Sequence, residues 1–319
     1  MSFMTPPLLD FVECPDAAGR HRMAFWQWGD AAAPHVVLCV HGLTRQGRDF
    51  DVLAQHLIDA SPQPLRVVCP DVLGRGRSDW LADPMGYQVP QYAGDMVALL
   101  HALHAQAPIS RLDYVGTSMG GLIGMVLAGH HELPLPTPVH RLVLNDVGPV
   151  IQPSAIARIT RYVGQGAVYD NLASAAAAMW AISTGFGPHT EAQWLALSAP
   201  MVVPVSQRSD DGRERRASAT DEGGPVRLHY DPAIAQPLLA ITPEMITQAE
   251  QTMWALYDAI TAPTLLIRGA DSDLLSPATA AAMTQRGPRA RLTEFSGVGH
   301  APTFVAPEQS AAVAGFLLD

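Results

Sequence analysis

One short run of the chain places a single serine between a strand and a helix. Residues 114–121 read Tyr-Val-Gly-Thr-Ser-Met-Gly-Gly, so an apolar strand enters Gly-x-Ser-x-Gly and a small-residue helix follows. This pattern is typical of a nucleophile elbow, in which glycines on either side relieve the crowding of a strained turn. The serine also lies at a helix N-terminus, where free N–H groups favour developing negative charge. Ser118 is therefore the candidate nucleophile.

A second strand ends in a turn that could bind a substrate oxygen. The apolar run 36–40 leads into His41-Gly42-Leu43. The backbone N–H of Leu43 is one candidate oxyanion donor, and that of Met119, next to the serine, is the other. We expect His41 to brace this turn rather than to act as a base.

Two further loops supply an acid and a base. The apolar strand 264–269 opens into residues 270–277, Ala-Asp-Ser-Asp-Leu-Leu-Ser-Pro, which offer Asp271 and Asp273. Residues 296–302, Ser-Gly-Val-Gly-His-Ala-Pro, follow a last predicted strand and present His300 between small residues. A serine hydroxyl needs a base, and the base needs a carboxylate to hold its tautomer. The order along the chain is Ser, Asp, His.

A fifth motif lies at residues 69–79, Cys-Pro-Asp-Val-Leu-Gly-Arg-Gly-Arg-Ser-Asp. With these five motifs the chain resembles the α/β-hydrolase superfamily from about residue 23 to residue 318. The resemblance implies a mostly parallel central sheet with helices on both faces and an inserted helical cap. It favours Asp273 as the acid, because the family usually places its acid four residues before a proline, here Pro277. Asp146 is the alternative, since some relatives carry the acid there.

Alternating strand and helix patterns support an α/β fold with a parallel sheet. We expect an antiparallel strand at 23–28 on one sheet edge, and parallel strands at 36–40, 65–69, 112–116, 141–145, 264–269 and 290–295. Helices are expected near 47–59, 91–106 and 119–130. We therefore expect the chain to form a first segment of the α/β-hydrolase core at 1–149, a helical cap at 150–260 and a second core segment at 261–319.

The cap interval lacks the strand alternation. Helices are expected at 156–163, 170–182, 190–197 and 244–260, and the polar stretch 206–224 predicts an exposed loop. Aromatic cap residues could line an apolar pocket. Trp180 and Trp254 are the pocket candidates there, and Arg45 beside the oxyanion turn is a candidate contact for a substrate carboxylate.

Composition narrows the partners to a small-molecule substrate. The formal charge is −10 and every basic side chain is arginine, so nucleic acid would be repelled. The three cysteines look like core residues, and neither an export signal nor a membrane-spanning run is evident, which favours a cytoplasmic location. No metal or nucleotide motif is present, so we expect no cofactor. A homodimer is left open.

The leading interpretation is a serine hydrolase that cleaves carboxylic esters or lactones through an acyl-enzyme. A serine rather than an aspartate at the elbow argues for acyl transfer to water. One alternative within the superfamily is a C–C bond hydrolase of the meta-cleavage type, which would need an anion site in its pocket. A ligand-binding receptor with slow hydrolysis is the alternative from another class, because fold alone does not fix function.

Overall fold

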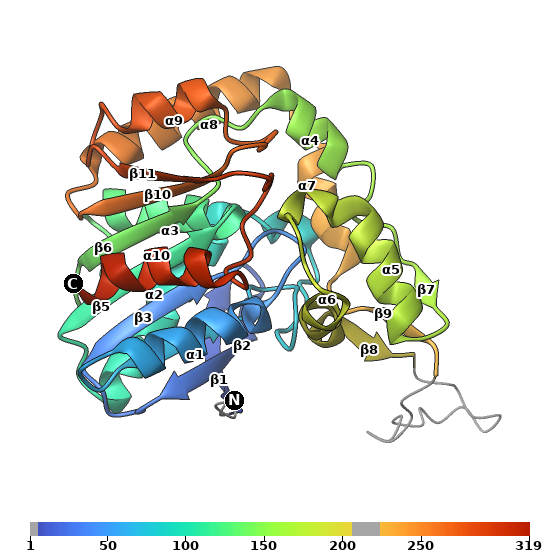
Figure 1. Ribbon diagram of the computed structural model, residues 1–319, viewed down its shortest axis with the longest axis horizontal. Coiled ribbons are helices and arrows are strands. Elements are labelled where there is room, and N and C mark those ends of the chain that lie inside the picture. The colour runs from blue at the N-terminus through green and yellow to red at the C-terminus, as the bar shows by residue number, and fades with distance from the viewer. Residues whose placement is uncertain (1–5, 206–223) are drawn as a thin grey trace.

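The computed structural model describes residues 6–205 and 224–319. Its centre is a sheet of eight strands in the order β1-β2-β4-β3-β5-β6-β10-β11 (Figure 1). The six strands from β4 to β11 run parallel, whereas β2 pairs antiparallel with both β1 and β4. The central sheet strands span Leu8–Asp16 (β1), Gly19–Gly29 (β2), His35–Val40 (β3), Arg66–Pro70 (β4), Arg111–Thr117 (β5), Val139–Asn145 (β6), Thr264–Gly269 (β10) and Arg291–Phe295 (β11).

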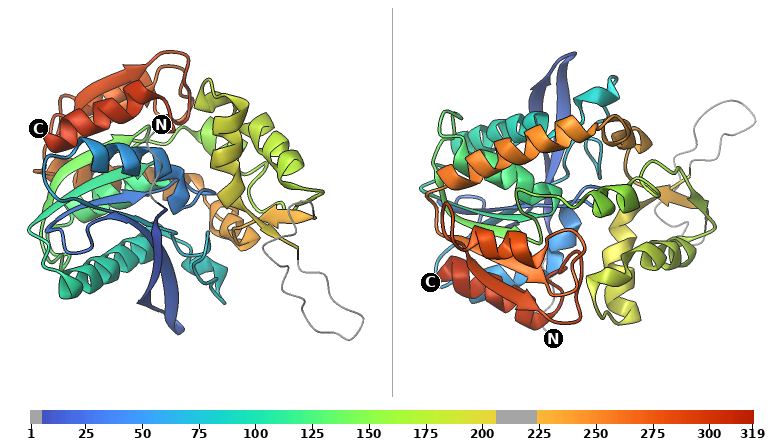
Figure 2. Two further views of the ribbon diagram at one scale, coloured as in Figure 1. Left: turned by 60° about the horizontal axis from the view of Figure 1, so that its bottom comes forward. Right: turned by 90° about the horizontal axis from the view of Figure 1, so that it is seen from above.

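Helices cover both faces of this sheet (Figure 2). The helices of the core and its flanks span Asp51–Ala60 (α1), Val89–Gln106 (α2), Met119–Gly129 (α3), Pro243–Ala259 (α8), Pro277–Met283 (α9) and Pro307–Leu318 (α10). One face packs against α1 and α10 through Leu53, Leu57 and Val313. The opposite face packs against α2, α3 and α8 through Leu99, Ile123 and Tyr257. Two apolar layers around a parallel sheet require strands that are apolar on both sides, and Val36–Val40 is fully buried.

The core elements expected from the sequence are confirmed, but β1, α9 and α10 are core elements that were not expected. Each predicted parallel strand and core helix is present, and the pairing of residues 23–28 is antiparallel as expected. The sheet edge, however, is β1, which lies outside β2. Six of the nine β1 residues are exposed, so this strand shows little of the hydrophobic alternation that marks a half-buried strand.

The segment between β6 and α8 forms a separate lobe beside the core (Figure 1). Its elements span Pro153–Ile159 (α4), Val168–Tyr169 (β7), Leu172–Ser183 (α5), Glu191–Ser198 (α6), Val202–Pro204 (β8), Val226–Leu228 (β9) and Ala235–Leu239 (α7). The helices expected at 156–163, 170–182 and 190–197 are present here as α4, α5 and α6, but the lobe also contains a three-stranded antiparallel sheet, β7-β9-β8. Strands of two or three residues are too short to produce a readable alternation. The expected exposed loop at 206–224 lies almost wholly outside the described residues.

Helix α8 is placed differently from the expectation. It was expected within the cap, yet it lies along α3, and its Tyr257 is fully buried in the main core. The Tyr257 hydroxyl donates to the carbonyl of Met283 at the end of α9. This helix therefore packs as part of the core layer, and the cap lobe proper ends before it.

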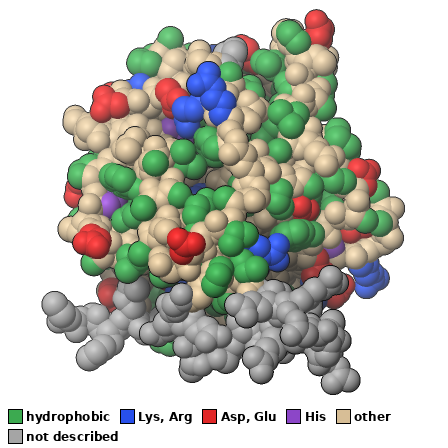
Figure 3. All heavy atoms as spheres, turned by 90° about the vertical axis from the view of Figure 1, so that its right-hand side faces the viewer, with side chains coloured by type: hydrophobic (Ala, Val, Ile, Leu, Met, Phe, Trp, Pro, Cys, Tyr) green, Lys and Arg blue, Asp and Glu red, His purple; other side chains and the backbone are tan. Residues whose placement is uncertain are grey.

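The lobe is tied to loops at the carboxyl ends of the parallel strands. The backbone N–H of Gly299 donates to the carbonyl of Gly185, and that of Asp231 donates to the carbonyl of Gly74. The face of the molecule shown in Figure 3 carries many scattered apolar side chains, with a few acidic and arginine side chains between them. No helix among the described residues is long and apolar enough to cross a membrane.

Candidate active site

The elbow at the end of β5 holds Ser118 in a backbone conformation that few side chains adopt. Its φ is 52° and its ψ is −116°. A Cβ on Gly116 would lie 2.4 Å from the carbonyl oxygen of Gly120, and one on Gly120 would lie 2.0 Å from that of Val40. Both glycines are therefore required sterically. The surrounding packing holds the strained serine at the start of α3.

His300 reaches this serine from the loop after β11. Its Nε2 lies 2.9 Å from Ser118 Oγ, and its Nδ1 lies 2.7 Å from an oxygen of Asp146. The imidazole side chain is 12% exposed, so both ring nitrogens work in a largely dehydrated environment. A ring that donates from Nδ1 to a carboxylate leaves Nε2 free to accept the serine proton.

The acid next to His300 is Asp146, and the expectation of Asp273 is wrong. Asp273 forms a two-pronged ion pair with Arg158 of α4, at 2.6 and 3.0 Å, and its side chain is 48% exposed. Asp271 is exposed as well. Asp146, immediately after β6, has no exposed side-chain area. Strands β6 and β10 are neighbours, so both candidate acid loops open at the same place, and the one after β6 turns its carboxylate inward.

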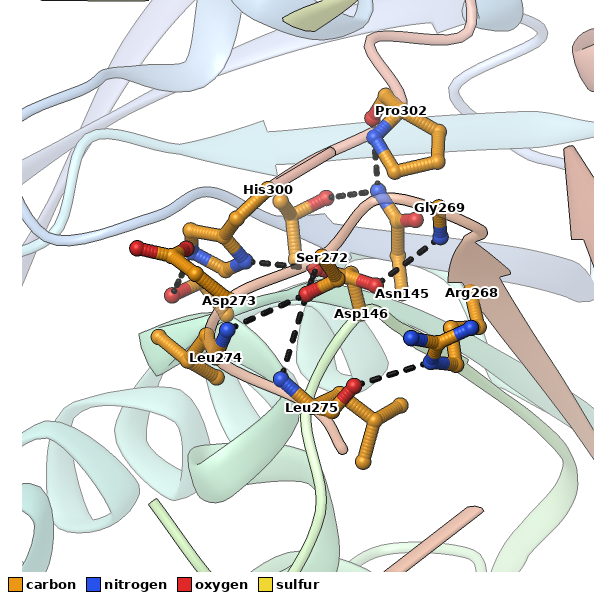
Figure 4. A network of polar contacts seen from close by, with 12 residues as sticks. Asn145, Asp146, Arg268, Gly269, Ser272, Asp273, Leu274, Leu275, His300 and Pro302 are labelled. Atoms are coloured by element: carbon orange, nitrogen blue, oxygen red, sulfur yellow. Dashed lines mark hydrogen bonds and ion pairs between the residues drawn. The ribbon is translucent and has the colours of Figure 1, made fainter. Parts of the chain in front are cut away.

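A network fixes the Asp146 carboxylate (Figure 4). One oxygen accepts the backbone N–H of Gly269 at 2.9 Å, while the other accepts the Ser272 hydroxyl at 2.6 Å as well as His300. Ser272 in turn accepts the N–H groups of Leu274 and Leu275. The loop expected to supply the acid thus supplies a supporting hydroxyl instead. Three donors, from β10, the loop after β10 and the loop after β11, thus fix the position of this carboxylate.

The turn after β3 faces the nucleophile. A Cβ placed on Gly42 would lie 3.6 Å from the Cβ of Ser118. His41 Nε2 lies 2.9 Å from the backbone N of Val72, and since that group can only donate, Nδ1 carries the proton and donates to the Gly42 carbonyl at 2.7 Å. Burial, with a smaller effect from the Arg75 and Arg45 charges, lowers the pKa of His41 to about 3. His41 is thus a neutral brace of the turn, as expected.

Arg75 is a site residue that the sequence did not single out. Its guanidinium is fully buried and donates to the carbonyl of Leu43 at 2.8 Å and to the Tyr92 hydroxyl at 2.8 Å. It also approaches the sulfur of Met119 at 3.7 Å. One side chain therefore contacts both residues whose N–H groups are the expected oxyanion donors. Its position within the Gly-Arg-Gly of the motif at residues 69–79 is the signal that could have identified it.

The remainder of that loop is architectural. Asp71 accepts the backbone N–H groups of Gly47 and Arg77, each at 2.8 Å, and the indole N–H of Trp26. Burial raises the pKa of its carboxyl to about 6 even with these donors. Asp71 thereby joins the loop after β4 to β2 and to the start of the α1 region.

Residues 35–307 match the family model of the alpha/beta hydrolase fold. This chain belongs to the α/β-hydrolase family. It is 48% identical over 305 residues to a 3-hydroxybutyrate-oligomer hydrolase of Cupriavidus necator, a match that covers 96% of each chain. It is 24% identical to 2-(acetamidomethylene)succinate hydrolase of Mesorhizobium japonicum, over 86% of this chain and 84% of that one.

A solved structure supports the same assignment. An α/β hydrolase from Novosphingobium aromaticivorans superimposes with a TM-score of 0.76 at 36% identity, over 99% of both chains. The match to the Cupriavidus necator relative and to this structure extends over nearly the whole length, and the present chain is a hydrolase of the α/β-hydrolase family.

The three pocket candidates of this hydrolase lie in different places. Arg45 lines a small cavity of about 40 Å³ with His41, Thr117 and the loop after His300. Trp180 packs edge-on against Trp194 at 5.0 Å inside the cap. Trp254 stacks under the guanidinium of Arg286 at 4.0 Å and contacts Tyr257, on the core side of α8. Trp254 is therefore a packing residue of the core and not part of a cap pocket.

Arg45 is engaged by protein groups. Its guanidinium pairs with Asp49 at 2.6 and 2.7 Å and donates to the carbonyl of Leu197 in α6 at 3.2 Å. It therefore links the oxyanion turn to the cap, and its charge is already balanced by a carboxylate.

A larger cavity of about 290 Å³ lies between the cap and the loops around β11, lined by Phe186, His189 and Thr303 among others.

Proposed function

We propose that this hydrolase cleaves carboxylic esters through a Ser118–His300–Asp146 triad and an acyl-enzyme. The observation that carries the proposal is the continuous hydrogen-bonded chain from Asp146 through His300 to Ser118, at 2.7 and 2.9 Å. Nucleophile, base and orienting acid occupy the three positions that acyl transfer requires.

The steps follow from these contacts. Ser118 Oγ attacks the ester carbonyl while His300 Nε2 takes its proton, and Asp146 stabilises the resulting imidazolium. The N–H groups of Leu43 and Met119 are the proposed donors to the tetrahedral oxyanion, and each such donor typically contributes about 3 kcal/mol to the transition state. His300 then returns the proton to the leaving alcohol. Water, deprotonated by the same nitrogen, releases the acyl group as a carboxylic acid.

The proposed substrates are short linear oligomers of 3-hydroxybutyrate. This proposal is supported by the 3-hydroxybutyrate-oligomer hydrolase of Cupriavidus necator, which is 48% identical to this chain over 96% of both lengths. Such oligomers join the carboxyl of one unit to the hydroxyl of the next, so each bond is an ordinary ester. Arg45, the residue considered for a substrate carboxylate, is paired with Asp49, and this pairing does not favour the C–C hydrolase alternative.

Stopped-flow hydrolysis of p-nitrophenyl butyrate tests the mechanism. We expect a burst of one nitrophenolate per enzyme, followed by turnover, because the acyl-enzyme accumulates. In Ser118→Ala the burst disappears and kcat falls by about 10⁴-fold or more. Near-normal activity in Ser118→Ala contradicts the mechanism.

The substrate is tested separately with the 3-hydroxybutyrate trimer. We expect the wild type to release monomer and dimer from the trimer with a higher kcat/KM than it shows for the butyrate ester. A Ser118-dependent burst without trimer cleavage would keep the esterase and reject the substrate. Strong ligand-induced stabilisation with little turnover would instead support the receptor alternative.

A further inference from the structure

The β1-β2 hairpin protrudes from the core (Figure 2). Between this hairpin and α2 lies a buried cluster of side chains that could bind a metal, and none of them belongs to the triad. Cys14 of β1 and His21 of β2 are directly paired across the hairpin, and Asp95 comes from α2. Their side chains are all buried, and one potential ligand atom of each lies within 4.8 Å of the others. Three different ligand types thus converge from three elements.

Two polar atoms in this cluster lack hydrogen-bond partners. Within the described part of the chain, His21 Nε2 and Asp95 Oδ2 are both buried and make no hydrogen bond. His21 Nε2 lies 3.2 Å from Asp95 Oδ1, without hydrogen-bond geometry, and this contact is an ion pair when the imidazole is protonated. Against the opposing effect of burial, Asp95 and Asp16 raise the pKa of His21, so in the absence of a metal the cluster is a histidine between two carboxylates. A buried polar atom without a hydrogen bond is destabilising, so two of them in one cluster favour a partner that binds both.

The surrounding contacts orient these atoms as in a metal site. His21 Nδ1 lies 2.9 Å from an oxygen of Asp16, which leaves Nε2 directed at the cluster. Metal-binding histidines commonly donate their second nitrogen to a carboxylate in this way. Gln91 donates to Asp95 Oδ1 at 2.8 Å and so leaves Oδ2 as the available oxygen.

We propose that Cys14 Sγ, His21 Nε2 and Asp95 Oδ2 bind one Zn²⁺ ion that fastens the β1-β2 hairpin to α2. A thiolate, an imidazole and a carboxylate together suit zinc, whereas magnesium and calcium prefer oxygen ligands alone. Tetrahedral zinc brings its ligand atoms to about 3.5 Å from one another, and since all three atoms already lie within 4.8 Å, a small contraction suffices. Binding releases the Cys14 proton.

The role is structural. The edge strand β1 contacts the rest of the fold through β2 and α2, and four of its residues, Leu8 to Phe11, are exposed. A metal that joins both strands to the helix would hold this edge against fraying. The chemistry at Ser118 does not involve it.

Metal-stripped full-length protein titrated with Co²⁺ and with Zn²⁺ tests the site. We expect one ion per chain, a thiolate-to-cobalt charge-transfer absorption, and a Tm increase of about 4 °C or more with excess zinc. Cys14→Ser removes a ligand and should abolish both signals. Cys39→Ser is the matched control, because Cys39 is an equally buried free thiol outside the cluster, and it should retain both.

Asp95→Asn provides a second reading if Cys14→Ser does not fold. It preserves the shape of the side chain, so loss of the zinc-dependent Tm increase supports coordination. The proposal is overturned if the wild type binds less than a tenth of an equivalent, or if Cys14→Ser retains the cobalt absorption. It is also overturned if Asp95→Asn lowers the Tm by the same amount in the presence of zinc and of a chelator. That result would mean that Asp95 stabilises the protein through its ion pair with His21 and not through a metal.

Discussion

At the scale of single residues, the identity of the catalytic acid depends on which of two aspartate side chains points toward His300. Asp146 and Asp273 follow neighbouring strands, and either loop could face His300. Three donors hold Asp146 in the interior, whereas Arg158 draws Asp273 to the surface. Ser118 and His300 were predictable from their local glycines. The acid was not, because a side chain's direction at a strand end depends on partners distant in sequence.

His41 gives a pH prediction at this scale. Its folded pKa of about 3 lies below the unfolded value of about 6.5, so between these pH values the unfolded chain binds one more proton. The stability that neutral His41 contributes is therefore present above pH 6.5 and lost as pH falls toward 3.

The variant His41→Gln isolates this effect. Between pH 6 and pH 4 the unfolding free energy of the wild type should fall more steeply than that of the variant, by about 1.4 kcal/mol per pH unit at most. Comparing the two proteins cancels Asp71, whose raised pKa acts in the opposite direction. Urea unfolding at several pH values measures the difference, and parallel curves would mean that folded His41 takes up its proton in the same pH range as the unfolded chain, which would contradict the lowered pKa.

At the scale of elements, the strands that could be predicted from the sequence are those that are long and buried on both faces. The parallel strands and the helices α1, α2 and α3 were expected because their apolar runs are continuous or helically periodic, whereas α9 and α10 were not expected. The exposed β1 and the short β7-β9-β8 sheet had no such signal. Helix α8 was recognised as a helix, but its packing against α3 depends on tertiary contacts such as Tyr257 with Met283.

The elbow predicts a steep steric cost at the β5-α3 junction. Gly120→Ala should destabilise the protein by more than about 2 kcal/mol, because the new methyl group would lie 2.0 Å from the Val40 carbonyl oxygen. Gly315→Ala in α10 is the matched control. A Cβ there meets nothing within 4 Å, so this change should stabilise by about 0.5–1 kcal/mol. Equal stabilities of the two variants in urea would contradict the packing of the elbow.

At the scale of the whole molecule, several polar contacts join cap and core. Arg45 reaches Leu197, Arg158 pairs with Asp273, and the Tyr87 hydroxyl donates to Asp231 at 2.6 Å. The last contact is buried and charge-assisted, whereas the Arg158 pair is largely exposed and contributes little. We therefore expect cap docking to depend more on Tyr87 and Asp231 than on the ion pair.

A double-mutant cycle measures this link. Tyr87→Phe should cost about 2 kcal/mol, because it leaves the Asp231 carboxylate and the Leu81 N–H without their shared partner. Tyr87→Phe, Asp231→Asn and the double variant should show a coupling energy of about 1–2 kcal/mol in urea unfolding. Strictly additive effects would show that the contact does not stabilise the docked cap.

The measurement that tests the central claim most directly is kcat for Asp146→Asn beside Asp273→Asn, on p-nitrophenyl butyrate. Asp146→Asn should lower kcat by about 10⁴-fold, because the orienting carboxylate of the triad is lost. Asp273→Asn should change kcat less than about twofold, because only an exposed ion pair is removed. A large loss in Asp273→Asn with a small one in Asp146→Asn would contradict the assignment of the acid and, with it, the proposed triad.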